Sequence, residues 1–127
     1  MTVTIFHNPA CSASRRALAT IREAGVEPEI VLYLKTPPDR ARLEGLIAAI
    51  GLPVREIMRA REPAYAALGL GDPAVTDAQL VDAILAHPVL LNRPIVETPR
   101  GTRLCRPAEV ALDLLDPPAT DDRETPR

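Results

Sequence analysis

The sequence predicts an α/β fold built on a mixed sheet, in the order strand, helix, strand, a helical segment, two strands and a helix. Two observations support this prediction. The first forty residues pass from an extended pattern to a helical one and back, which is typical of a βαβ unit. Near the end, two short extended segments flank a turn, as in a hairpin. The chain has 127 residues, which suits a single domain, and we place that domain at residues 1–116.

The βαβ unit is formed by three consecutive segments. Residues 2–6, TVTIF, alternate threonine with apolar side chains and are typical of a strand. From Ser12 or Ser14 onwards apolar residues recur at helical spacing, and Gly25 is a natural stop for that helix. Residues 29–34, EIVLYL, are almost continuously apolar, which predicts a buried strand parallel to the first.

The segment from about 38 to 88 shows helical patterns and contains no strand candidate. Its first helix has an apolar face and ends at Gly51, and two shorter helical pieces follow it. Residues 76–79, TDAQ, form a capping-box pattern that begins a further helix. That helix should end before Pro88. We therefore expect a helical insertion between the βαβ unit and the hairpin.

The hairpin consists of RPIVET (93–98) and TRLCR (102–106), with a PRG turn between them. A closing helix follows, with Pro107 at its first helical position. Residues 117–127 are rich in proline and charge, and we expect a disordered tail there. This order of elements is compatible with a thioredoxin-like fold that carries a helical insertion.

Composition argues against several classes of protein. The net charge is −2 and only 2% of the residues are aromatic, so neither a basic surface nor stacking platforms favour nucleic-acid binding. The chain shows no signal-peptide pattern and no apolar run near the about 20 residues of a membrane span, so we expect a cytoplasmic location. The two cysteines are far apart and should be free thiols, and neither they nor the two histidines have metal-site spacing.

Cys11 lies where the first strand has ended and the first helix begins. The free N–H groups and the dipole of a helix N-terminus stabilise a thiolate and attract anions. Ser14 can offer a hydroxyl to the thiolate, and Arg15 or Arg16 adds positive charge unless it faces water. His7 either lowers the pKa of the thiol when protonated or orients the loop. Cys11 is alternatively a small core residue, but its position in a turn among polar neighbours favours a nucleophile.

Counting residues tests two related cysteine motifs. Phosphatase-type loops place an arginine six residues after the cysteine, where this chain has Ala17. A dithiol CxxC pair would need a second cysteine at position 14, where this chain has Ser14. Both motifs are therefore absent, and a nucleophilic Cys11 would need its second thiol from another molecule.

Three arginines stand out by their context, namely Arg59, Arg93 and Arg106. The last two each precede a proline and flank the predicted hairpin. A guanidinium group binds tetrahedral oxyanions in bidentate fashion, so several arginines near a thiolate would suit an anionic substrate. Each of them is also compatible with an ordinary surface arginine, and spacing does not select among them. The Arg93–Pro94 bond is a candidate cis peptide.

Five segments, in the same order, resemble the glutaredoxin-coupled arsenate reductases: FHNPACSASR, EPEIVLYLKTPP, MRAREPAYAALGL, LLNRPIV and GTRLCRPAEVALDLL. The resemblance implies a thioredoxin-like fold with a helical insert and the reduction of arsenate to arsenite. It implies that Cys11 attacks arsenic to form a thiol–arsenate ester and that glutathione then attacks this adduct. Glutaredoxin would resolve the resulting mixed disulfide.

The same resemblance assigns roles to single residues. The oxyanion would be bound by Arg59, Arg93 and Arg106, while His7 and Ser14 would support the thiolate and Pro94 would match the cis-proline position. RLCRP is closer to the arsenate reductases proper, whereas MRARE is closer to relatives of less certain function. We expect no bound cofactor, glutathione as co-substrate, a monomer, and a packing role for Cys105.

Two alternatives remain open from the sequence. Some thioredoxin-fold relatives are redox-sensing transcription regulators that bind RNA polymerase, but they commonly use the CxxC switch that this chain lacks. A second alternative keeps the thiol chemistry and changes the substrate to another oxyanion or to a glutathione disulfide.

Overall fold

A four-stranded mixed sheet is the centre of the computed structural model, which describes residues 2–115. The segment 117–127, expected to be a disordered tail, lies outside the described residues. The strand order is β2-β1-β3-β4, with β1 and β2 parallel and the other pairs antiparallel. The strands are β1 (Thr4–Phe6), β2 (Glu29–Val31), β3 (Ile95–Thr98) and β4 (Gly101–Leu104).

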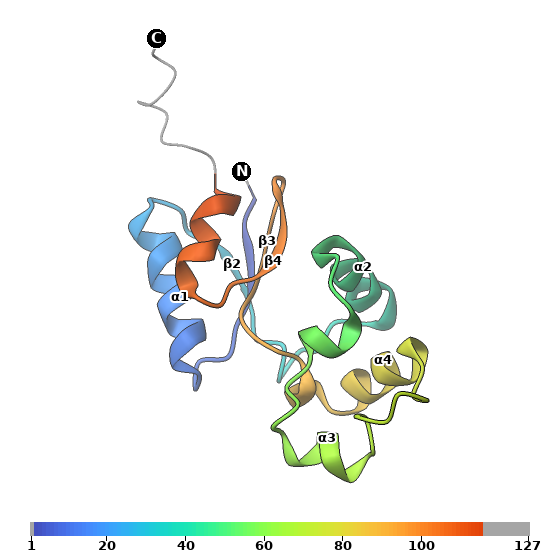
Figure 1. The fold of residues 1–127 in the computed structure, drawn as a ribbon. Helices are drawn as coiled ribbons and strands as arrows, with labels where there is room; N and C mark the ends of the chain where they lie inside the picture. Colours follow the sequence, from blue (N-terminus) through green and yellow to red (C-terminus); the bar gives the residue numbers. More distant parts are fainter. Residues whose placement is uncertain (1, 116–127) are drawn as a thin grey trace.

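Helices lie on both sides of this sheet (Figure 1). On one side α1 packs against the 3-10 helix η3, and on the other side α2 packs near β4. The predicted helical insertion is present and supplies the helices of the second side. The helices are α1 (Ser12–Glu23), α2 (Arg40–Ile50), η1 (Val54–Ile57), α3 (Pro63–Ala67), α4 (Asp77–Ala86), η2 (Pro88–Leu90) and η3 (Ala108–Leu114).

The alternation of side chains along β1 gives the protein two hydrophobic cores. Successive side chains of a strand point to opposite faces of the sheet. Val3 and Ile5 accordingly join the cluster under α1 and η3, whereas Phe6 joins the cluster under the helical insertion. Ile5 is fully buried and Phe6 is 2% exposed, so both faces of the strand exclude water.

The ends of the insertion's helices follow the sequence signals. Asp39 caps α2 by accepting a hydrogen bond from the Arg42 N–H at 2.8 Å, and Gly51 ends that helix in the left-handed region with φ of 77°. Thr76 and Gln79 form the predicted capping box at the start of α4. These predictions are confirmed.

The second predicted strand is shorter and more exposed than its sequence suggested. β2 ends at Val31, and the chain then turns, because the carbonyl of Leu32 accepts hydrogen bonds from the N–H groups of Lys35 and Thr36. The parallel pairing is confirmed, but the prediction of a buried strand was wrong. β2 lies at the edge of the sheet with one neighbour, and Ile30 is 37% exposed.

The closing helix also differs from its prediction. It is a 3-10 helix, and Pro107 is its N-cap residue rather than its first helical residue. The apolar residues Ala111 and Leu114 still point into the cluster shared with α1. The pattern of apolar residues was therefore read correctly, while the helix type was not.

The Arg93–Pro94 and Arg106–Pro107 bonds are both cis.

Candidate active site

Cys11 is the N-cap residue of α1 and follows the loop that leaves the end of β1. Its backbone is extended, with φ of −99° and ψ of 124°, and its side chain is only 9% exposed. The first N–H groups of a helix have no intrahelical acceptor. The thiol therefore lies next to the backbone donors that begin α1.

The surroundings of Cys11 favour its thiolate. Burial by itself raises the pKa of the thiol, but the backbone N–H groups of Ser14 and Ala13 and the side chain of Arg93 act in the opposite direction. The net effect is a pKa below the ordinary value of a cysteine. The expected helix-terminus effect is therefore accompanied by a specific arginine.

The loop before Cys11 is held by Asn8, a buried residue that the sequence analysis did not single out. Its carbonyl accepts from the Cys11 N–H at 3.0 Å, and its Oδ1 accepts from the Ala10 N–H at 3.0 Å. Its own N–H donates to Ser14 Oγ at 3.0 Å. The Asn-Pro pair, a common turn signal, was the clue in the sequence. Asn8 fixes where the thiol leaves the loop.

His7 and Ser14 form a buried pair beneath this loop, with 2.6 Å between His7 Nδ1 and Ser14 Oγ. Burial, followed by the positive charges of Arg22 and Arg15, lowers the pKa of His7. His7 is therefore neutral near pH 7, which favours the loop-orienting role over the charged one. The Ser14 hydroxyl has His7 and Asn8 as partners, so Ser14 acts on the sulfur through its backbone N–H instead.

Two segments that are distant in the sequence meet beside the cysteine loop. An isolated antiparallel bridge pairs Met58 with Leu91, and the Arg59 N–H donates to the carbonyl of Leu90 at 2.8 Å. This pairing aligns the segment that carries Arg59 with the segment that carries Arg93. Neither local propensity nor residue spacing revealed it.

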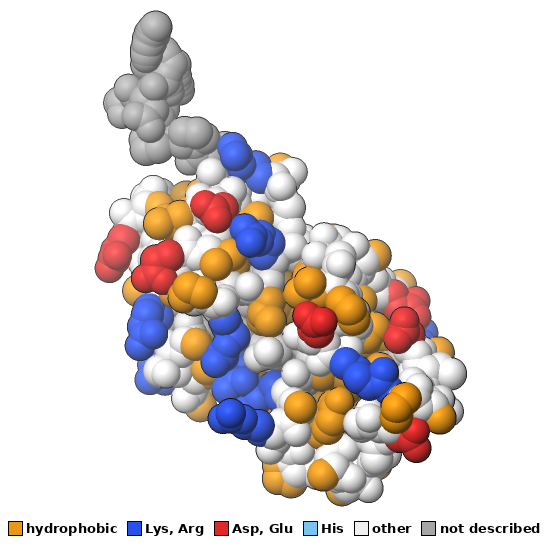
Figure 2. Space-filling view, in the orientation of Figure 1, with side chains coloured by type: hydrophobic (Ala, Val, Ile, Leu, Met, Phe, Trp, Pro, Cys, Tyr) orange, Lys and Arg blue, Asp and Glu red, His pale blue; other side chains and the backbone are white. Residues whose placement is uncertain are grey.

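The three arginines singled out in the sequence share one pocket. Arg106 Nη1 donates to the carbonyl of Arg93 at 3.1 Å, and Arg59 forms an ion pair with Glu62 at 3.0 Å. Arg93 connects this pocket to Cys11. In Figure 2, Lys and Arg side chains gather around the N-terminal end of α1 and beside the helical insertion. The pocket is lined by Met58, Arg59, Ala60, Arg61, Asn92, Arg93 and Arg106.

The two arginines next to Cys11 in the sequence are arranged differently. Arg15 donates from Nη1 to the carbonyl of Pro9 at 2.7 Å, and Arg16 is exposed. Neither of them is among the groups that shift the pKa of Cys11. Their positive charge therefore contributes less to the thiolate than Arg93, which is far away in the sequence.

Cys105 lies in the apolar cluster under α1 and is fully buried. Its Sγ is 3.7 Å from the carbonyl of Arg103, to which the thiol donates. Burial raises the pKa of Cys105 to about 12, so this thiol stays protonated near pH 7. These surroundings are those of a packing residue rather than of a nucleophile.

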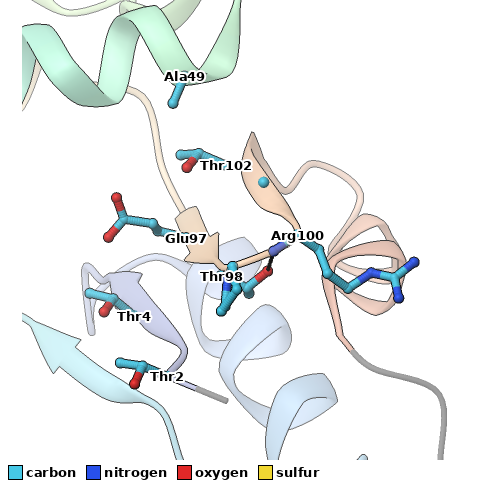
Figure 3. Close-up of a pocket in the computed structure, with 9 residues that line it drawn as sticks. Thr2, Thr4, Ala49, Glu97, Thr98, Arg100 and Thr102 are labelled. Carbon is cyan, nitrogen blue, oxygen red and sulfur yellow. Dashed lines mark hydrogen bonds between the residues drawn. The ribbon is translucent and has the colours of Figure 1, made fainter.

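A second pocket lies at the other end of the sheet (Figure 3). It is formed around the β3–β4 turn, where the Arg100 N–H donates to Thr98 Oγ1 at 3.0 Å and the Arg100 side chain points away from the labelled threonines. Its nine lining residues include no cysteine or histidine. This pocket therefore offers neither a thiol nucleophile nor an imidazole.

Residues 2–115 offer neither a metal site nor a membrane-spanning helix. No group of three or more His, Cys, Asp or Glu side chains is placed there to hold a metal ion. None of the helices in this range has the length and apolar character that a membrane span requires.

The fold and the site together define a thioredoxin-like protein with one activated cysteine beside an arginine pocket. Residues 6–114 match the model of the ArsC family, and the chain belongs to that family. The arsenate reductase of Rhizobium meliloti (strain 1021) is 61% identical over 91% of this chain and 82% of its own length. An arsenate reductase of Escherichia coli is 55% identical over 89% of this chain and 80% of its own. The resemblance stated from the sequence is confirmed.

Solved structures give the same result for the fold. The arsenate reductase from Vibrio cholerae has a TM-score of 0.88 and 41% identity, covering 91% of this chain and 98% of its own. A putative arsenate reductase from Yersinia pestis has a TM-score of 0.82 and 43% identity, covering 87% and 98%. The predicted thioredoxin-like α/β fold is thus confirmed.

Proposed function

We propose that this protein is an arsenate reductase that uses glutathione and glutaredoxin as its source of electrons. The observation that carries the proposal is the meeting of an activated Cys11 with a pocket lined by Arg59, Arg93 and Arg106. A low-pKa thiolate is a nucleophile, and guanidinium groups hold an anionic substrate against it. The named relatives support arsenate as that anion.

The first step joins sulfur to arsenic. The Cys11 thiolate attacks the arsenic of H₂AsO₄⁻, an oxygen leaves as water after taking up a proton, and a Cys11–S–AsO₃H⁻ ester remains. Arsenic stays pentavalent in this step. Positive charge from Arg93 would balance the charge that accumulates when a thiolate meets an oxyanion.

The second step carries the reduction. Glutathione attacks the sulfur of Cys11, the S–As bond breaks, and its electron pair leaves with arsenic as H₂AsO₃⁻. A mixed disulfide between Cys11 and glutathione forms, in which each sulfur has given up one electron. Glutaredoxin then removes the glutathione by thiol–disulfide exchange, which restores the Cys11 thiol. An external thiol is needed because position 14 carries Ser14 and Cys105 is buried away from the pocket.

The remaining expectations belong to the same proposal. The enzyme would act in the cytoplasm as a monomer, and it would hold no resident cofactor because glutathione arrives as a co-substrate. The three arginines would bind the oxyanion. Arg59 would interact with the substrate and with Glu62, its ion-pair partner. His7 and Ser14 would hold the loop from which Cys11 attacks.

The decisive experiment measures NADPH oxidation by glutathione reductase in the presence of glutathione, glutaredoxin and arsenate. We expect turnover by the wild type, none by Cys11→Ser, and wild-type turnover by the control Cys105→Ala. Absence of turnover by the wild type, or full turnover by Cys11→Ser, would reject the proposal. Phosphate, selenate and glutathionylated peptides in place of arsenate test the alternative substrates, and a pull-down with RNA polymerase tests the regulator alternative.

A further inference from the structure

Two buried side-chain atoms among the described residues lack a hydrogen-bond partner, namely Tyr33 Oη and Arg93 Nε. Tyr33 is 1% exposed, so its hydroxyl is not open to bulk solvent. A buried polar group without a partner destabilises the folded state, and native proteins seldom retain one without a reason. Both atoms therefore call for a functional explanation.

The two atoms belong to the same site. Tyr33 packs in the same apolar cluster as Met58, and Met58 lines the arginine pocket together with Arg59 and Arg93. Burial raises the pKa of Tyr33 despite the opposing charges of the two arginines, so the phenol remains a neutral O–H donor near pH 7. The side chain and the charge of Arg93 in turn lower the pKa of Cys11. The phenol, the guanidinium and the thiol thus form one cluster.

No neighbouring side chain satisfies the phenol. Asn8 is near enough for its side chain to lower the pKa of Tyr33, but Asn8 and the hydroxyl do not have the geometry of a hydrogen bond. The ring of Tyr33 packs in the apolar cluster with Phe6 and Met58, which fixes the position of its hydroxyl. The hydroxyl is therefore held in place and is free to bind something else.

We propose that Tyr33 is a substrate-binding residue whose hydroxyl donates a hydrogen bond to an oxygen of the oxyanion held beside Cys11, together with the Nε–H of Arg93. A guanidinium N–H can only donate, and a neutral phenol donates readily, so both atoms need an acceptor. A tetrahedral oxyanion offers acceptor oxygens in several directions. The identity of that oxyanion as arsenate rests on the proposed function.

The first test compares stability with and without the anion. In urea unfolding without arsenate, Tyr33→Phe should be as stable as the wild type or more stable, because it removes an unpartnered buried hydroxyl. Added arsenate should raise the unfolding midpoint of the wild type more than that of Tyr33→Phe. A lower stability of Tyr33→Phe without arsenate, combined with an equal response to arsenate, would indicate a structural hydroxyl and overturn the proposal.

The second test observes the phenol directly. The chain has two tyrosines and no tryptophan, so Tyr65→Phe leaves Tyr33 as the single tyrosine signal. Neither tyrosine lines the arginine pocket, but Tyr33 is buried in the apolar cluster that contains the lining residue Met58, whereas Tyr65 is only partly buried against that cluster. In a Cys11→Ser/Tyr65→Phe protein, which cannot form the ester, arsenate should shift the near-ultraviolet absorption of Tyr33 in a saturable manner. A flat titration at arsenate concentrations that protect Cys11 of the wild type from alkylation would overturn the proposal.

Kinetics separate this proposal from the proposed function. Loss of a hydrogen bond to a charged ligand should raise the KM for arsenate of Tyr33→Phe on the order of ten-fold or more, with Tyr65→Phe as the matched control. Wild-type turnover with an unchanged KM in Tyr33→Phe would overturn the role of Tyr33 and leave the proposed function intact. A wild type without turnover whose Tyr33 signal still responds to arsenate would reject the reductase and support the binding role.

Discussion

Replacing Arg93 by glutamine would remove a side chain that lowers the pKa of the nucleophile and also lines the arginine pocket. Arg93 lowers the pKa of the Cys11 thiol through a side-chain hydrogen bond and through its charge. It also lines the pocket with Arg59 and Arg106. Glutamine removes the charge and the guanidinium fork but keeps the backbone, whose carbonyl holds Arg106.

The size of the effect follows from these contacts. A hydrogen bond to a charged group contributes about 1.5–3 kcal/mol, which corresponds to a factor of roughly 10 to 150. Arg93→Gln loses one such contact to the thiolate and, under the proposed function, at least one to the oxyanion. We therefore expect kcat/KM for arsenate to fall by roughly 10² to 10⁴. Arg93→Lys should fall less, because it retains the charge and loses only the fork.

The assay is the coupled NADPH oxidation, combined with the pH dependence of iodoacetamide alkylation of Cys11. We expect Arg93→Gln to move the alkylation midpoint to higher pH, because the loss of positive charge raises the pKa of the thiol. Arg16→Gln is the matched control, since it removes the same charge from an exposed position on α1. If Arg93→Gln equals that control in both kcat/KM and alkylation midpoint, the assignment of Arg93 is refuted.

Three further predictions concern the cysteine loop. Wild-type alkylation should modify Cys11 with a midpoint below that of free cysteine and leave native Cys105 unmodified, as mass spectrometry would show. Ser14→Ala should lower the urea-unfolding free energy by about 1–3 kcal/mol, because two buried partners lose their hydrogen bond; unchanged stability would contradict this. The lowered pKa of His7 means that the unfolded chain binds more protons, so stability should fall as the pH drops below about 6.5. His7→Gln should flatten that slope, and His87→Gln, which leaves His7 in place, should keep it.

Local patterns in the sequence were sufficient for most of the fold. Strand alternation, helical periodicity and capping signals depend on neighbours within a few residues, so β1, α1, α2 and α4 were all predicted close to their observed positions. The exposed β2 and the 3-10 form of η3 were missed. Whether a strand lies at the edge of a sheet depends on which strands pair with it, and the residues of the strand itself do not determine this pairing.

For the cysteine loop, too, the sequence predicted one part of the arrangement and the structure supplied the rest. The sequence placed Cys11 at a helix start and excluded a second cysteine at position 14, because both facts are local. The hydrogen bonds inside the loop could be assigned only from the three-dimensional structure. There, the side chains of His7 and Ser14 are hydrogen-bonded to each other. The hydroxyl of Ser14 is therefore used to build the loop, while its N–H faces the sulfur.

The sequence by itself determined the family, the order of the elements and the position of the nucleophile, since each of these is written in short stretches of residues. The tertiary structure alone decided which side chains surround that nucleophile. The bridge between Met58 and Leu91 brings Arg59 and Arg93 into one pocket, and the turn after β2 places Tyr33 in the apolar cluster that contains both bridge residues. These contacts join segments that are distant along the chain, and they form only when the packing of the whole domain compensates for the entropy of bringing such segments together.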